Sequence, residues 1–215
     1  MNTAAALMLA TLALLMAWSP PTAASRIDWG PLLRVQAGLG LADPGLEQFA
    51  TEASLWGRAR LGPTIVQGQV LARHETEDRL EPGRPDDGLR SPINPRHLLG
   101  DHAEWALREL FVDLPWRGAN LRIGKQQIVW GNSDGIKYLD LINPQSFSEF
   151  ISAPQDQSRI PLWSLQVQRE LGPQLGVDLL LIPDLSLHDI PEPGALYEIT
   201  SPLLSPQGAA TTPPD

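Results

Sequence analysis

The sequence has no cysteine and, after residue 24, no apolar run that approaches the length of a membrane-spanning helix. The missing cysteine excludes a disulfide framework and thiolate chemistry. The missing run means that contact with a membrane must come from strands or from the protein surface. Positive charge is also scarce, since 16 Lys and Arg stand against 25 Asp and Glu, for a formal net charge of −9. This balance argues against nucleic acid as a partner, because phosphate backbones reward basic patches.

The first 24 residues have the pattern of a secretory signal peptide. Residues Ala4 to Trp18 are apolar and uncharged, but this run is shorter than the roughly 20 residues that a spanning helix needs. Small residues follow at Thr22, Ala23 and Ala24, where cleavage is expected. No Lys or Arg precedes the run, so an uncleaved apolar anchor is the alternative. The sequence predicts export over residues 1–24.

Apolar and polar residues alternate over 46–76, on both sides of Gly62-Pro63. The odd positions of the first arm are mostly apolar or small, and its even positions carry Gln, Glu, Ser and Arg, with Trp56 as the exception. A period of two places alternate side chains on opposite faces of a strand, and Gly-Pro marks a tight turn. Each arm is longer than the roughly 9–11 residues that a tilted strand needs to cross a bilayer.

Two further hairpins are predicted over 105–130 and 161–182, and residues 76–103 and 131–159 join the three hairpins as long loops. Short turns at one end and long loops at the other are typical of outer-membrane β-barrels. The sequence therefore predicts an all-β fold, an antiparallel meander of long hairpins that forms a partial transmembrane β-barrel over 46–185.

The two flanks of this region are less regular. Residues 25–45 show no clear period, so they are predicted to be a linker or a first strand. Residues 186–215 are rich in Pro, Ser and Thr and are predicted to be a flexible tail.

A soluble periplasmic β-sandwich that binds a ligand is the alternative fold, because it also alternates and also uses Gly-Pro turns. Two observations favour the membrane. The apolar side carries Ala and Gly besides large residues, which suits a wall facing lipid, and the polar side is rich in Gln, Arg and Glu, which suits a wet lumen. Tryptophan suits a membrane interface, and the predicted interface aromatics are Trp56, Trp116, Trp130 and Trp163.

One block of the sequence carries a resemblance. It runs Gly124-Lys125-Gln126-Gln127-Ile128-Val129-Trp130-Gly131-Asn132-Ser133-Asp134-Gly135, continues through Leu139-Asp140-Leu141-Ile142-Asn143-Pro144, and closes with Ser158-Arg159-Ile160-Pro161-Leu162-Trp163. This block resembles a family of porin-like outer-membrane proteins of Gram-negative bacteria, a domain of unknown function with a Gly-Arg-Gln…Trp-Gly strand end and an Asn-Pro loop. Lys125 departs from that pattern. The resemblance is best over 105–171 and implies a porin-like barrel in outer-membrane lipid, without naming a solute.

Charged residues on the predicted strands and in the second loop are candidates to line a pore. Arg122 and Lys125 would cost about 2–4 kcal/mol each if they faced lipid near the midplane, so they are expected to face the lumen, with a bulge near Gly124. The loop 131–159 either folds inward as a constriction or is a solvated outer loop with turns at Asn143-Pro144, which is the favoured interpretation. The pore-lining candidates are Arg58, Arg60, Arg122, Lys125, Asp134, Asp140 and Arg159.

Two enzymatic or metal-binding alternatives were weighed against this channel. Asp134 and Asp140 could form a glycosidase pair, but nothing in the sequence fixes their separation. A compact group of metal-ligand types occurs at His97, Asp101, His102 and Glu104, without a known ligand spacing. We therefore predict no catalytic residue, no metal and no cofactor, and a protein that is not an enzyme.

The barrel interpretation has one difficulty, which is that the predicted strands are too few to close a ring. Six predicted strands are fewer than the 8 or so of the smallest bacterial barrels, and the chain ends in Asp215 after two prolines rather than in an aromatic residue. Three explanations remain: the N-terminal part of a larger barrel from a truncated or frameshifted gene, two extra strands from 25–45 and 194–204, or several chains that share one barrel. The function expected is a channel, or part of one, for small solutes. A truncated product by itself is expected to have no activity.

Overall fold

The computed structural model describes residues 26–39, 46–78, 80–82, 87–129, 141–149, 155–192 and 194–198, which form one antiparallel sheet. Its strands are β1 (Arg26–Leu39), β2 (Leu46–Leu61), β3 (Thr64–Glu75), β4 (His97–Leu98), β5 (Ala103–Trp116), β6 (Ala119–Gln126), β7 (Leu162–Gly172) and β8 (Leu175–Leu181), with short helices η1 (Asp87–Leu89) and α2 (Gln155–Ser158). The predicted all-β antiparallel meander is confirmed. The predicted signal peptide lies outside the described residues. No helix among them is long and apolar enough to cross a membrane.

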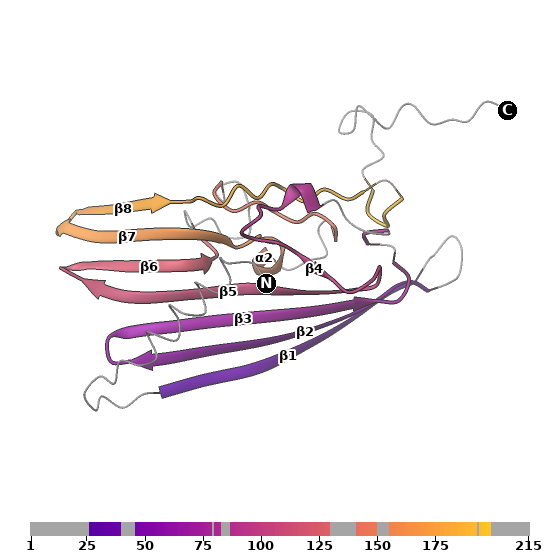
Figure 1. The fold of residues 1–215 in the computed structure, drawn as a ribbon, viewed down its shortest axis with the longest axis horizontal. Coiled ribbons are helices and arrows are strands. Elements are labelled where there is room, and N and C mark those ends of the chain that lie inside the picture. Colours follow the sequence, from indigo (N-terminus) through magenta and orange to yellow (C-terminus); the bar gives the residue numbers. More distant parts are fainter. Residues whose placement is uncertain are drawn as a thin grey trace, which may run out of the picture.

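Chain neighbours are also neighbours in the sheet, in the order β1-β2-β3-β5-β6-β7-β8, while the short β4 pairs with the free part of β5 beyond β6. The predicted hairpins correspond to β2–β3, β5–β6 and β7–β8. Tight turns join them at one end of the sheet, and the longer connections lie at the other end (Figure 1). The β5–β6 turn is Arg117-Gly118, and both residues have positive φ, as a two-residue hairpin turn that matches strand twist requires.

The region predicted to be a linker or a first strand is a 14-residue strand, β1, that pairs with β2 along its whole length. Its outward positions begin at Ile27 and Trp29 and continue at every second residue to Leu39. The alternation was missed in the sequence because Leu32 on the inner face stands beside Leu33 on the outer face, and Pro31 interrupts the apolar series.

The sheet is open in the described part of the chain, where β1 pairs only with β2 and β8 only with β7. The sequence analysis allowed for two extra strands from 25–45 and 194–204. The first of these exists as β1, whereas residues 194–198 form turns and residues 199–204 lie outside the described part. A closed barrel is therefore not seen.

Side chains separate by face along every long strand. On the outward face stand residues such as Val35, Leu55, Val70, Leu165 and Leu179, each paired in register with another outward position. The inner face carries Arg, Glu, Gln and Ser at the alternate positions. A single sheet with one apolar and one polar face results, and in the described residues no second sheet covers the apolar one.

A bulge in β5 keeps this separation intact. The pairing of β3 with β5 shifts between Gln69 and Val70, so that Arg108 is an extra residue in β5. Before the bulge Trp105 and Leu107 pair with outward positions of β3, and after it Leu110 and its alternate neighbours do so. A bulge reverses the alternation of a strand, and here it places both apolar series of β5 on the same face.

Gly124 has a backbone conformation that no other residue type adopts easily, with a φ of 138°. A Cβ built there would lie 2.1 Å from the Leu110 carbonyl oxygen. The predicted bulge is wrong in form, because the pairing with β5 and β7 keeps register through Gly124. The following residue, Lys125, stands opposite the outward Leu110 and Trp163, yet only 6% of its surface is exposed, and it lines a cavity on the inner side.

The connections at the loop end fold back over the inner face. Asn143, Ser148 and Glu149 are buried, so the favoured interpretation of a solvated outer loop is wrong for residues 143–149. The predicted flexible tail also begins too early, because Ser186 and Asp189 are buried. The physical reason is pairing with distant segments: the Phe147 N–H donates to the Asp189 carbonyl at 2.7 Å. Residues 199–215 of that tail lie outside the described part.

We expect Gly124→Ala to destabilise the sheet by about 2–3 kcal/mol or more, because it adds backbone strain and a clash with the carbonyl of β5. The measurement is the urea midpoint of the refolded protein. Gly57→Ala is the matched control, since Gly57 also lies within a strand, has nothing within 4 Å of a built Cβ and shows no positive φ. Equal midpoints for the two variants would contradict the assigned role of Gly124.

Candidate functional site

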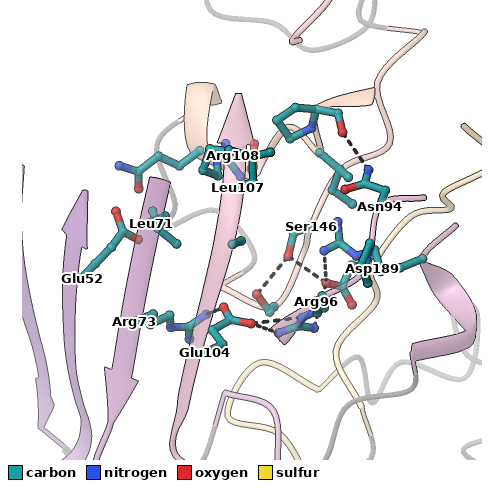
Figure 2. A pocket seen from close by; sticks show the side chains of 18 of the residues that line it. Glu52, Leu71, Arg73, Asn94, Arg96, Glu104, Leu107, Arg108, Ser146 and Asp189 are labelled. Carbon is teal, nitrogen blue, oxygen red and sulfur yellow. Dashed lines mark hydrogen bonds and ion pairs between the residues drawn. The ribbon is translucent and has the colours of Figure 1, made fainter. Parts of the chain in front are cut away.

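A polar cavity of about 110 Å³ lies between the inner face of the sheet and the folded-back connections (Figure 2). Strands β2, β3, β5 and β6 form one wall, and the segments before β4, around residue 148 and after β8 form the other. The charged residues that line it are Glu52, Arg73, Glu81, Arg90, Arg96, Glu104, Arg108, Lys125, Glu149 and Asp189.

Arg96 is the centre of the ion pairs in this cavity. Its guanidinium bonds both oxygens of Glu81, donates to Glu104 at 2.6 and 3.1 Å, and lies 3.6 Å from Asp189. Burial by itself lowers the pKa of Arg96, but the carboxylates of Glu104, Glu81 and Asp189 outweigh burial and raise this pKa above its usual value. The guanidinium is therefore a permanent cation that holds three carboxylates together.

Arg73 joins the sheet to the connection after β6. It points inward from β3 and lies 3.9 Å from Glu104 on the neighbouring strand β5 and 3.8 Å from Glu149. Gln36 of β1 donates a further hydrogen bond of 3.1 Å to Glu149. Two inward residues from two strands, Gln36 and Arg73, thus fix this loop segment against the sheet. Figure 2 shows the neighbouring row from Arg73 through Glu104 and Arg96 to Asp189.

A second set of contacts fastens the segment after β8. Arg90 donates to Asp189 at 3.1 Å. Asn94 donates to the Pro161 carbonyl and to Asp184, both at 2.9 Å. Because these groups are buried, their hydrogen bonds offset the cost of removing them from water. The three connections therefore form one packed layer on the inner face.

The predicted pore-lining residues occupy different places on the inner side. Lys125 lines the cavity. Arg58 and Arg60 lie at inward, exposed positions near the turn end of β2. Arg122 also faces inward, paired with Asp113 at 2.5 and 2.7 Å and stacked over Phe111 at 4.4 Å.

Among the described candidates, Arg58, Arg60, Arg122 and Arg159 do not line the cavity. Arg159 bridges to Gln145 at the loop end of the sheet. Asp134 and Asp140 lie outside the described residues, and the suggested glycosidase pair lies there with them. Of the five candidates that lie in the described part of the chain, Lys125 is the one that lines the cavity.

The residues that the sequence analysis missed are mainly the arginines of the cavity, Arg73, Arg90, Arg96 and Arg108. Arg73 stood at a polar position of a predicted strand, which was a usable signal. Arg108 was hidden by the bulge, which gives it an inward position outside the simple alternation. Arg90 and Arg96 lie in a loop, and their partner Asp189 is more than 90 residues away in sequence, so no local pattern could find the pair.

The group of metal-ligand types at His97, Asp101, His102 and Glu104 does not converge. His97 stacks on Trp105 with 4.2 Å between ring centroids, while Glu104 is bound by Arg96. Among the described residues no three His, Cys, Asp or Glu side chains are arranged to hold a metal ion.

The predicted interface aromatics divide between the two faces. Trp116 and Trp163 stand at outward positions near the ends of β5 and β7. Trp56 faces inward instead, where its indole lies against Gly30, with 3.1 Å from Nε1 to a Cβ built there. The prediction does not hold for Trp56, because its even position puts it on the polar face. Trp130 lies outside the described residues.

Comparisons with protein-family models, with curated proteins and with solved structures give no match to this chain. The resemblance to porin-like proteins therefore remains a prediction.

We expect Arg96→Met to destabilise the protein by about 3–5 kcal/mol, because it leaves buried carboxylates without their shared cation. Urea unfolding and limited proteolysis of the inner connections measure the effect. The matched control is Arg26→Met, which removes an exposed ion pair at 3.0 Å to Asp28 worth about 0–1 kcal/mol. An Arg96→Met variant as stable and protease-resistant as the control would refute the central role of this residue.

Proposed function

We propose that this chain forms part of the wall of an outer-membrane β-barrel. The barrel serves as a channel, or as part of one, for small solutes. The observation that carries the proposal is the exposed apolar outward face, which extends over all the long strands. Leu33 is 67% exposed, Leu55 48% and Leu179 61%. Soluble monomers rarely expose contiguous apolar patches larger than a few hundred Å², whereas a barrel in lipid needs such a band.

The spacing of two outward tryptophans matches the thickness of the apolar part of a bilayer. Trp105 and Trp116 lie near the two ends of β5, on the same face because of the bulge between them. Eleven residues of strand correspond to about 36 Å at roughly 3.3 Å per residue. At a tilt of about 45° this spans about 25 Å, the height of the apolar band between the two aromatic girdles of a barrel.

The inner face supports the channel part of the proposal. Its strand positions carry charged and amide side chains, and the connections held by Arg73 and Arg96 fill part of the space in front of them. Inward-folded segments that carry charge narrow a pore and give it selectivity. The same arrangement argues against the periplasmic β-sandwich, which needs its second layer over the apolar face rather than over the polar one.

The proposal requires β1 and β8 to be paired. Every backbone N–H or C=O left unpaired in hydrocarbon costs several kcal/mol, and both outer strands have a free edge in the described part of the chain. We propose that further strands, from this chain or from other chains, complete the ring.

Single cysteines test the placement in lipid, and the absence of native cysteine makes each label unique. Spin labels at the outward Leu55, Val70 and Leu165 of outer membranes should be accessible to oxygen and shielded from a water-soluble nickel chelate. The inward control positions are Gln67 and Gln166, each beside an outward one, and they should show the reverse. Membrane insertion would be contradicted if the nickel chelate reached the outward and the inward labels equally and a urea wash released the protein. That result would favour the soluble alternative.

Planar-bilayer recordings test the channel itself. We expect discrete conductance steps from the refolded protein once its labels show insertion, because the inner face is polar and charged. A protein that inserts by the label criterion but conducts no ions in a closed ring would refute the channel while leaving the barrel wall in place.

A further inference from the structure

Lys125 is the unusual cation of the inner cavity. Only 6% of the surface of Lys125 is exposed, and its ammonium forms no hydrogen bond or ion pair with the described residues. The charges that act on it most are Arg90 and Arg108, which repel it, and Asp184, which attracts it from a distance. A buried ammonium without a partner is costly, and such groups are candidates for function.

The nearby carboxylates cannot neutralise Lys125. Asp184 already accepts from Asn94 at 2.9 Å, from the Trp163 N–H at 3.1 Å and from the Ser186 hydroxyl at 2.7 Å. The carboxylates that line the cavity are held by arginines, as Arg96 holds Glu81 and Glu104. The ammonium therefore borders the cavity, and in the described residues no carboxylate is hydrogen-bonded or ion-paired to it.

Arg90 provides a second, independent sign of a missing anion. Its terminal nitrogen bonds Asp189, but its Nε is buried with no hydrogen-bond partner. Arg90 lines the same cavity as Lys125. A buried N–H donor without an acceptor is rare in native structures and calls for an unseen partner.

The cavity also has an apolar part. Leu71 of β3 and Ala106 of β5 are paired inward neighbours, and they line it together with the buried Ile160 and Pro161. Its volume of about 110 Å³ is that of a few water molecules, at roughly 30 Å³ for each in the liquid. The space therefore fits a small molecule with a charged end and a short apolar body.

We propose that this cavity binds a small aliphatic monocarboxylate, with Lys125 as its main charge partner and the Arg90 Nε–H as a second donor. One negative charge matches one unpaired ammonium, and the apolar walls accommodate a chain of a few carbons. This inference deepens the proposed function, since it names a solute class for the lumen, and it rests on that function for the placement of the cavity in the permeation path.

Butyrate is the probe, titrated by calorimetry into the protein refolded in detergent micelles. We expect saturable binding to the wild type and a rise of its thermal midpoint with butyrate. In Lys125→Met, which keeps the length of the side chain without its charge, binding should weaken at least tenfold and the midpoint should not respond. Butylammonium, which has the same apolar body and the opposite charge, should not bind to either protein.

Arg58→Met is the matched control, because Arg58 is an inward but exposed cation of the same sheet, outside the cavity. It should bind butyrate as the wild type does. An equal loss of butyrate affinity in both variants would mean that the charges of the inner face attract butyrate diffusely. Unchanged affinity in Lys125→Met would show that Lys125 does not bind butyrate. Either result overturns the proposal. Lys125→Met should be at least as stable as wild type without ligand, since it removes a lone buried charge, so misfolding is recognised by a fall of the midpoint.

The conservative variant Lys125→Arg resolves the case in which Lys125→Met misfolds. It keeps the cation, so butyrate should still raise its midpoint, and an unresponsive but folded Lys125→Arg overturns the proposal. Binding in micelles is independent of conductance. Butyrate binding without membrane insertion would support the site and refute the channel. Conductance without charge-dependent butyrate binding would support the channel and refute the site.

Discussion

Because successive side chains of a strand point to opposite faces, each charged residue of this sheet is committed to one side by its position in the sequence. The arrangement of the rest of the molecule depends on this separation of apolar and charged side chains between the two faces. Apolar side chains occupy one face from β1 to β8, and most charged side chains lie on the other. Arg169, near the turn end of β7, is an outward exception opposite Val177. Two local irregularities preserve this separation. The bulge at Arg108 returns Trp105 and Leu107 to the apolar face, and Gly124 allows Lys125 to lie on the inner side although its register neighbours face outward.

The charges gathered on the inner face then hold the connections. Arg73 belongs to the sheet, Arg96 to the loop before β4, and both contact Glu104 of β5. Away from bulk water such pairs are strong only as a complete network, since each lost partner leaves a buried charge behind. The layer on the inner face is therefore fixed by electrostatics more than by an apolar core, which is small in the described residues.

The distribution of burial is the reverse of that in a soluble domain. In an ordinary domain the apolar face would be the packed one, but here the connections cover the polar face and the apolar face stays exposed. Lipid would cover that face and additional strands would cover the edges of β1 and β8. The cavity fits this picture, because it lies on the polar side, enclosed by connections that no lipid would contact.

The sequence by itself determined the strands, their hairpins and the two faces, because a period of two is a local property that needs no knowledge of distant contacts. It predicted that Lys125 and Arg122 face inward, and it located the irregularity at Gly124. For residues 25–45 it left a linker and a first strand both open, because Leu32 and Pro31 blur the alternation of β1. Only the tertiary structure decided that the connections fold inward, that Trp56 lies against Gly30, and that Arg96 joins carboxylates from three segments. Those outcomes depend on pairings between residues far apart in the chain, such as Arg90 with Asp189, and no periodicity within either segment encodes them.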